Sequence, residues 1–212
     1  MTSGEILLDS IVTGNMTNAV QAAKDLIAGG TDAQMIVSEY MIKGMEEIGR
    51  RFEEGKAYVP NLLMAARAMK AALEIVKPYM ADEKTSTVGK IIIGTVQGDL
   101  HDIGKNLVAS MFEGCGFEVI NLGTNISADQ FVAAAKEHNA DIVCLSALLT
   151  TTMTYMETVI KAFDAAGLRD KVKIMVGGAP VNQKFADQIG ADAYTDNANA
   201  AVVVAKSLVG AV

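Results

Sequence analysis

The chain has 212 residues, half of them hydrophobic, and its 18 Lys and Arg are outnumbered by 25 Asp and Glu, which leaves a formal charge of −7. This apolar content permits a packed core and excludes global disorder, and the acidic balance argues against a nucleic-acid partner. Two His and two Cys exclude a disulfide framework, a Cys-rich zinc site and a multi-His metal site. Any metal would therefore be held mainly by something other than the protein.

The N-terminal residues contain neither a basic region nor a long apolar run, so no signal peptide is expected. No stretch of about 18 uninterrupted apolar residues occurs, so no membrane span is expected. We therefore expect a cytoplasmic protein in which Cys115 and Cys144 are reduced core residues.

The first eighty residues carry apolar side chains at helical spacing. Stripes with steps of three and four residues run over 41–52 and 62–76, which predicts amphipathic helices. Thr31-x-x-Gln34 has the pattern of a capping box that begins the third helix. These features predict a four-helix bundle domain over residues 1–80, followed by a polar linker at 81–89.

After residue 89, short apolar runs alternate with helical stretches. Buried strands are expected at 90–96, 117–122, 141–146, 172–176 and, weakly, 192–195. The helical patterns between and after them lie near 103–114, 127–138, 153–166, 182–189 and 198–209. This alternation predicts right-handed crossovers and a parallel sheet. The fold class expected for residues 90–212 is therefore an α/β domain with a Rossmann-like (flavodoxin-like), doubly wound sheet of five strands.

The loop after the first strand, residues 97–106, is expected at the edge where open parallel sheets bind ligands. Its glycines match neither the dinucleotide fingerprint nor the Walker loop. It places Asp99 two residues before His101, and a carboxylate at that spacing accepts a hydrogen bond from one imidazole nitrogen and directs the other outward as a metal ligand or base. Such a pair is as often a structural hydrogen bond, so the motif alone leaves both interpretations open.

Two further loops after strands carry small or polar residues. Residues 146–152 hold four hydroxyl groups, which either line a ligand site or cap the next helix. Gly177-Gly178 either lets a ligand approach the backbone closely or forms a simple tight turn. Each loop is ambiguous by itself.

Taken together, Asp99-x-His101-x-x-Gly104, Ser146-x-Leu148 and Gly177-Gly178 strongly resemble the cobalamin-binding domain. The resemblance implies that His101 replaces the cofactor's own base as the lower axial ligand of cobalt, with Asp99 as its hydrogen-bond partner and Thr152 extending this catalytic relay. It also implies that Gly104 opens space for the nucleotide tail in a cleft lined by the other two loops. The residues it implies for corrinoid binding are Gly98, Asp99, His101, Asp102, Ile103, Gly104, Ser146, Leu148, Thr150, Gly177 and Gly178.

The segment from Phe52 to Pro60 resembles the signature of the helical cap that precedes this domain in corrinoid methyltransfer proteins. In those proteins an aromatic and an aliphatic residue cover the upper corrin face, and the matching residues here are Phe52 and Val59. Relatives often carry Leu at the position of Val59. The helical register of Phe52 with Ile48 fits a place in the bundle core equally. The resemblance covers residues 4–210, nearly the whole chain.

The resemblance implies a carrier of methyl groups in a multicomponent methyltransferase system. Co(I) takes a methyl group from a substrate held by a substrate-specific methyltransferase, and a second methyltransferase, linked to tetrahydrofolate, receives it. A reductive activator of Co(II) is the third implied partner, and neither nucleic acid nor a membrane is expected. The partner protein selects the methyl donor, so the sequence of this chain does not identify the donor.

Three other functions share parts of this pattern. A cobalamin-dependent sensor or regulator needs an output module and usually Trp in its helical half, whereas this chain has no Trp. A detached cobalamin subunit of a mutase shares Asp-x-His-x-x-Gly but lacks the helical half. A non-catalytic corrinoid store also remains open, and the form of the cofactor, methylated or adenosylated, distinguishes a carrier from a sensor or mutase.

Overall fold

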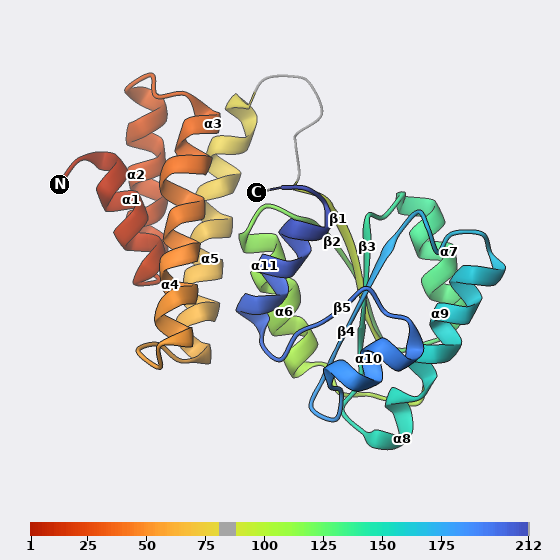
Figure 1. Cartoon of the computed structure of the whole chain (residues 1–212). Coiled ribbons are helices and arrows are strands. Elements are labelled where there is room, and N and C mark those ends of the chain that lie inside the picture. The colour runs from red at the N-terminus through yellow and green to blue at the C-terminus, as the bar shows by residue number, and fades with distance from the viewer. Residues whose placement is uncertain (81–87, 212) are drawn as a thin grey trace. The chain divides into compact units, whose positions relative to one another are not determined.

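A computed structural model describes residues 1–80 and 88–211, and the chain divides into two compact units, one that contains the N-terminal helices and one that contains the sheet (Figure 1). The predicted linker at 81–89 lies outside the described residues except for its last two positions, so the predicted domain bounds stay a prediction. Within the described ranges, no helix combines the length and apolar character that crossing a membrane requires.

The N-terminal unit is built from four helical segments, as the periodicity predicts. The first, second and fourth are α1 (Ser3–Val12), α2 (Met16–Ala28) and α5 (Val59–Val76), which ends in a 3₁₀ turn, η2 (Lys77–Tyr79). The third is one continuous run of α3 (Ala33–Met35), the π-helical stretch η1 (Ile36–Ile42) and α4 (Lys43–Glu53). The helices bury small and medium apolar side chains against one another, among them Leu7, Ala23, Met41, Ile48, Leu62 and Met69.

The third helical segment begins one residue later than the capping pattern predicts. Asp32, not Thr31, is the N-cap, and its Oδ1 accepts a hydrogen bond from the backbone N–H of Met35 at 2.9 Å. A carboxylate at the N-cap satisfies one of the free N–H groups and also interacts favourably with the helix dipole, so Asp32 serves better here than a threonine hydroxyl. The predicted box at Thr31 and Gln34 is therefore wrong.

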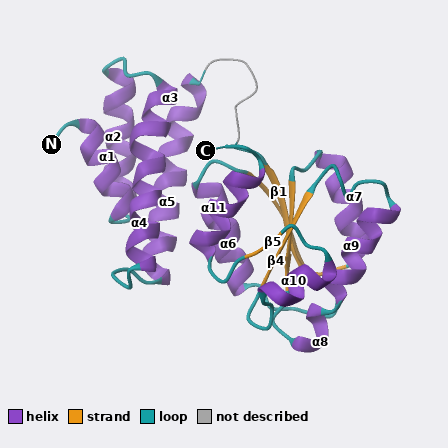
Figure 2. Ribbon diagram, in the orientation of Figure 1, coloured by secondary structure: helices purple, strands orange, loops and turns teal. Residues whose placement is uncertain are grey.

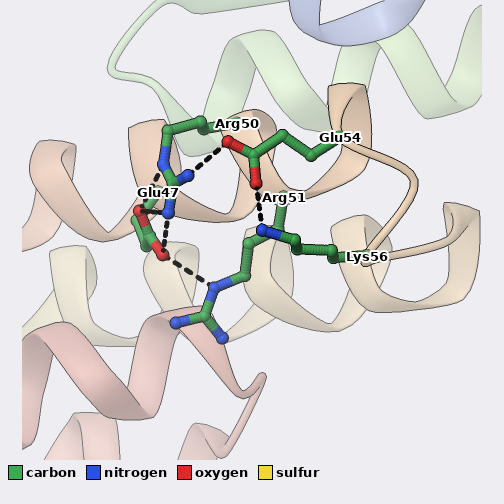
Figure 3. A network of polar contacts seen from close by, with 5 residues as sticks. All are labelled: Glu47, Arg50, Arg51, Glu54 and Lys56. Atoms are coloured by element: carbon green, nitrogen blue, oxygen red, sulfur yellow. Dashed lines mark hydrogen bonds and ion pairs between the residues drawn. The ribbon is translucent and has the colours of Figure 1, made fainter.

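A charged network lies across the end of α4, just before the turn that leads into α5 (Figure 3). Glu47 accepts hydrogen bonds from both Arg50 and Arg51, and Glu54 pairs with Arg50 and Lys56. These hydrogen bonds, first that from Arg51, lower the pKa of Glu47 below its ordinary value. Because Arg50, Glu54 and Lys56 are exposed and the other two side chains partly exposed, each pair adds little to stability, and the network mainly orders the last turn of the helix.

The second unit is a five-stranded sheet in which every neighbouring pair is parallel. Its strands are β1 (Lys90–Val96), β2 (Glu118–Ile126), β3 (Ile142–Ser146), β4 (Lys173–Gly177) and β5 (Ala193–Tyr194). Their order is β2-β1-β3-β4-β5, which is the flavodoxin-like arrangement, and the predicted fold class is confirmed. β2 is longer than predicted and continues to Ile126, and its pairing with β1 contains two register shifts.

Helices cover both faces of this sheet (Figures 1 and 2). α6 (Ile103–Gly114) and α11 (Ala198–Leu208) lie on one face, and α7 (Ala128–His138), α9 (Tyr155–Ala165) and α10 (Gln183–Ile189) lie on the other. A short helix, α8 (Thr150–Met153), precedes α9. Between the sheet and the second group of helices lies an apolar core that includes Ile92, Phe131, Val143, Phe163 and Ile174. The order of strands reverses between β1 and β3, and a crevice at that point is where such folds bind ligands.

Candidate functional site

The carboxylate of Asp99 joins the loops that follow β1 and β3. Its Oδ1 accepts hydrogen bonds from the backbone N–H of His101 at 3.0 Å and lies 2.7 Å from Nδ1 of the same residue. Its Oδ2 accepts from the backbone N–H of Leu148 at 2.8 Å and from the hydroxyl of Thr152 at 2.7 Å. The side chain has no exposed surface, so all four donors replace water around a buried carboxylate.

These contacts determine the charge of Asp99. Burial by itself raises the pKa of the carboxyl group, because the charged form is poorly solvated inside the protein. The hydrogen bonds from Thr152, Leu148 and His101 outweigh burial and hold the pKa of Asp99 well below its usual range. Asp99 is therefore a carboxylate at every physiological pH.

His101 is held so that one ring nitrogen faces outward. A carboxylate only accepts hydrogen bonds, so Nδ1 carries the hydrogen directed at Asp99, and in the neutral ring Nε2 is left with a free lone pair. The backbone of His101 is fixed as well, because its carbonyl accepts a hydrogen bond from the buried hydroxyl of Thr95 at 2.9 Å. About half of the imidazole is exposed, 51% of the side chain, so Nε2 is accessible to a metal ion.

A cavity of about 750 Å³ opens beside His101 at the carboxyl ends of the strands. Its wall is formed by the loops after β1, β3, β4 and β5, together with α6 and the start of α11. Several large apolar side chains are exposed around His101: Leu100, Ile103, Leu148 and Leu149. Exposed apolar groups of this size around a polar ligand are typical of a surface that a large, flat molecule covers.

Most of the residues predicted for the site line this cavity. Those are His101, Asp102, Ile103, Gly104, Ser146, Leu148, Gly177 and Gly178. Asp99 and Thr152 lie directly behind His101 through the hydrogen bonds described above. Gly98 and Thr150 are not among the residues of the cavity wall. Phe52 and Val59 belong to the helical unit, where Phe52 is half-buried and Val59 is 41% exposed, and their predicted contact with a corrin stays a prediction.

Only glycine fits at position 178, because the loop after β4 approaches the loop after β3 closely there. Its φ is +129°, and a Cβ placed there would lie 1.8 Å from the carbonyl oxygen of Ala147. The loop after β4 therefore runs directly against the loop after β3, and both loops line the cavity. Gly177 has no such constraint, because its nearest contact, the carbonyl of Thr195, would be at 3.7 Å.

We expect Gly178→Ala to destabilise the protein by about 3 kcal/mol, because the new methyl group collides with backbone and the φ value disfavours any side chain. Urea unfolding of the full chain measures this loss. Gly177→Ala is the matched control and is expected to change stability by less than about 0.5 kcal/mol. Equal stability of the two variants would contradict the steric argument.

Sequence reasoning missed three groups at the site. Thr95 fixes the carbonyl of His101, and Asn125 contacts the backbone on both sides of the Gly98–Asp99 peptide bond. The loop after β5 adds Thr195, Asp196 and Asn197 to the cavity wall. An Asn before a helix start, such as Asn197, is a readable signal for a loop at the sheet edge. Thr95, inside an apolar strand, carries no such signal.

Lys105 is another residue that the motif left unexplained. It is only 4% exposed, and its ammonium group donates to Oδ1 of Asn106 at 2.7 Å and of Asn121 at 2.6 Å. Burial lowers the pKa of Lys105, and the charge of Asp102 opposes that shift. These contacts tie the first turn of α6 to β2, which stabilises the loop that carries His101.

Both units of the chain match models of known protein families. Models of the B12 binding domain match residues 89–203 and, for its helical counterpart, residues 5–77. The chain is 44% identical over 210 residues to dimethylamine corrinoid protein 1 of Methanosarcina acetivorans, covering 97% of this chain and 99% of that one. The chain belongs to the corrinoid protein family. Its cofactor is therefore cobalamin or a related corrinoid.

Two further similarities support the assignment to the corrinoid proteins. Trimethylamine corrinoid protein 2 of Methanosarcina acetivorans is 45% identical over 92% of this chain and 90% of its own length. The structure of the methanol:cobalamin methyltransferase complex of Methanosarcina barkeri matches with a TM-score of 0.86 at 27% identity, covering 99% of this chain and 80% of that chain. The fold and the paired helical and α/β units are thus those of this family.

The residues of the α/β unit fit a corrinoid. A half-exposed imidazole with an outward Nε2 could give one ligand to a cobalt ion whose other ligands come from the macrocycle. The apolar side chains around it suit the face of a corrin ring, and the adjoining cavity has the volume that a long nucleotide tail requires. One protein ligand is enough, which agrees with a sequence that has two histidines in all.

Thr152→Val is expected to destabilise the cofactor-free protein by about 1–2 kcal/mol, because it removes a hydrogen bond to a buried carboxylate without changing the shape of the side chain. Thr152→Ser keeps the hydroxyl group and should restore most of that loss. Thr150→Val, at an exposed position on the same short helix, is the matched control for urea unfolding. A Thr152→Val protein as stable as Thr150→Val would remove Thr152 from the relay.

Proposed function

We propose that this corrinoid protein carries a methyl group between a substrate-specific methyltransferase and a second methyltransferase linked to tetrahydrofolate, with His101 as the lower ligand of cobalt in the base-off/His-on state. When bound, the cofactor supplies the chemistry, because its cobalt accepts and releases the methyl group. The protein supplies the axial ligand, the apolar surroundings and the access of partners. We expect it to act in the cytoplasm and to depend on a reductive activator.

The Asp99–His101 pair is the observation that carries this proposal. Asp99 orients the ring through Nδ1 and holds its hydrogen there, so Nε2 is available as a metal ligand. A charged carboxylate behind the imidazole also makes Nε2 a stronger donor to cobalt. Thr152 and the N–H of Leu148 stabilise that charge, so the relay continues from the loop after β1 to the loop after β3. The proposed catalytic group is thus His101 with Asp99 and Thr152 behind it.

The wall of the cavity supports a role in holding the nucleotide tail. Ser146, at the end of β3, and the Gly177-Gly178 turn place a hydroxyl group and bare backbone along the cavity. The missing side chain at Gly104, whose Cβ would meet no atom within 4 Å, leaves room at the mouth. We propose that Gly98, Asp102, Ile103, Leu148 and Thr150 complete the corrinoid contacts.

The helical unit supports the methyl-carrier function over the mutase subunit. It matches the helical B12 binding domain over residues 5–77, and the carrier proteins that resemble this chain contain it. We propose that Phe52 and Val59 cover the upper face of the corrin and shield the methyl group. Substituting Ala for either residue would then speed hydrolysis or photolysis of the methylated cofactor, whereas a place in the bundle core predicts loss of stability instead.

Reconstitution with cobalamin followed by transfer assays tests the function. The purified chain is loaded with cobalamin, reduced, and mixed with a methylamine or a methanol methyltransferase and the matching substrate. We expect the bound cobalamin to become methylated and then to transfer that methyl group to a tetrahydrofolate-dependent acceptor protein. The names of the relatives make dimethylamine and trimethylamine the first donors to test. Tight binding of adenosylcobalamin with loss of the adenosyl group in light, and no methylation by any partner, would favour a sensor instead.

A further inference from the structure

Asn125, near the end of β2, forms hydrogen bonds with the backbone of Gly98 and Asp99. Its backbone N–H donates to the carbonyl of Asp99 at 3.0 Å, and its side-chain Oδ1 accepts from the N–H of Gly98 at 2.8 Å. The two hydrogen bonds lie on either side of the Gly98–Asp99 peptide bond. Asp99 itself is therefore held by β2 as well as by its own loop.

The irregular pairing of β2 brings Asn125 to this position. Ile93 pairs with Asn121 and Val96 with Ile126, so five residues of β2 advance where β1 advances three. The two extra residues form bulges, which are known to re-aim side chains beside functional sites and to end a strand's pairing. Without these two extra residues, a different residue of β2 would lie opposite the loop after β1.

The backbone of Asn125 adopts a conformation that few residues tolerate. Its φ is +58°, in the left-handed region, which is unfavourable for most residues with a side chain and which Asn accepts more readily. Within the described parts of the chain, Asn139 at the end of α7, with a φ of +50°, is the other residue besides glycine that has a positive φ. Asn139 offers the same conformation at a distance from His101 and is thus a natural control.

The contact between Asn125 and Gly98 contributes more to position than to folding. Both residues are exposed, so water would satisfy the N–H of Gly98 if the carboxamide were removed. Asp99, by contrast, meets four donors from two loops, and hydrogen bonds weaken steeply when their angles are wrong. A small displacement of the Gly98–Asp99 backbone would therefore act first on the bond between Asp99 and His101.

We propose that Asn125 is a positioning residue, which holds Asp99 against Nδ1 of His101 and so selects the imidazole tautomer that leaves Nε2 free. Asn125 contacts the Gly98–Asp99 backbone and Asp99 contacts the imidazole, so the effect of Asn125 on His101 passes through Asp99. The consequence for cobalt ligation rests on the proposed function, whereas the effect on the tautomer does not.

The tautomer is measured by ¹⁵N NMR of the full chain labelled in its histidines, without cofactor, at a pH where both rings are neutral. The chain has two histidines, so His138 is an internal reference. In the natural protein we expect His101 to be mainly the Nδ1–H tautomer. Asn125→Gly suits the backbone conformation but removes the acceptor, and we expect it to lower the ratio of Nδ1–H to Nε2–H by about threefold or more. Far-UV CD and thermal unfolding should stay close to the natural protein.

Two variants make the result specific. Asn125→Asp keeps an oxygen acceptor at the same place and should retain the natural tautomer ratio, and Asn139→Gly should leave His101 unchanged. An unchanged ratio in Asn125→Gly, or an equal change in Asn125→Asp, would overturn the role of Asn125. In the same proteins loaded with cobalamin, EPR of the Co(II) form reports imidazole ligation. Its absence from the natural protein would overturn His101 as the cobalt ligand, while the NMR ratio would still decide the role of Asn125.

Discussion

The cobalamin-loaded His101→Ala protein is expected to lose the nitrogen hyperfine pattern of a protein imidazole from the EPR spectrum of its Co(II) form. The reason is geometric, because His101 presents an accessible ring nitrogen beside the cavity and Asp99 holds the ring in the tautomer that leaves it free. We also expect cobalamin affinity to fall by more than the 10- to 100-fold that is typical when only the partner of a metal ligand is removed. Some cofactor should still bind through the cavity.

His138→Ala is the matched control, because it removes the other histidine of the chain. His138 lies in the last turn of α7, where a histidine interacts favourably with the helix dipole. This variant should bind cobalamin and show the hyperfine pattern of the natural protein. Free imidazole added to His101→Ala should restore nitrogen ligation, because the truncated side chain leaves an exposed gap. Persistence of the protein pattern in His101→Ala would rule out His101 as the ligand.

The alternation of strands and helices was predictable because each element is locally consistent. β1, β3 and β4 are short runs of branched apolar residues that become almost wholly buried, and period and length are enough to identify such strands. Ser127 and Gln130 form a capping box before α7, and both of its hydrogen bonds lie within four residues of sequence. Local hydrogen bonds leave local signals.

Other features depend on contacts between distant segments. The long β2 with its register shifts follows from pairing with β1, and the sequence after Leu122 reads as a loop because Gly123 and Asn125 are poor strand formers. The short helix α8 was missed because its four residues include three threonines, which favour caps and turns over helix interiors. In the site itself, Asp99, His101 and Thr152 were recognised by resemblance to a family. The contacts of Thr95 and Asn125 link separate strands and left no motif.

Asp99→Asn is expected to destabilise the cofactor-free protein by about 3–5 kcal/mol at neutral pH, because a carboxamide cannot accept all four hydrogen bonds. The amide oxygen can replace one carboxylate oxygen, but the NH₂ group replaces the other. In one orientation the NH₂ group faces the N–H of Leu148, and in the other it faces the N–H and Nδ1–H of His101. Either way buried donors meet a donor, where water has no access.

The loss of stability in Asp99→Asn should depend on pH, and the contacts of Asp99 determine whether that loss grows or shrinks in acid. The folded state holds the pKa of Asp99 below the value of about 3.9 for an unfolded Asp. A depressed pKa in the folded state stabilises the protein fully above the unfolded value, and that stabilisation is lost as pH falls toward the folded value. The natural protein should therefore lose stability in acid, and the gap to Asp99→Asn should narrow below a pH of about 4.

Urea unfolding at neutral pH and in acid separates this effect from a simple loss of charge. Asp102→Asn removes the same charge from an exposed position on the same loop and is expected to change stability by less than about 0.5 kcal/mol. If Asp99→Asn matched Asp102→Asn at neutral pH, the buried carboxylate would not organise the two loops. If the gap were large but independent of pH, shape rather than charge would hold the site together. A gap that is large at neutral pH and narrows in acid requires a charged Asp99, which is also the form that the proposed ligation of cobalt by His101 needs.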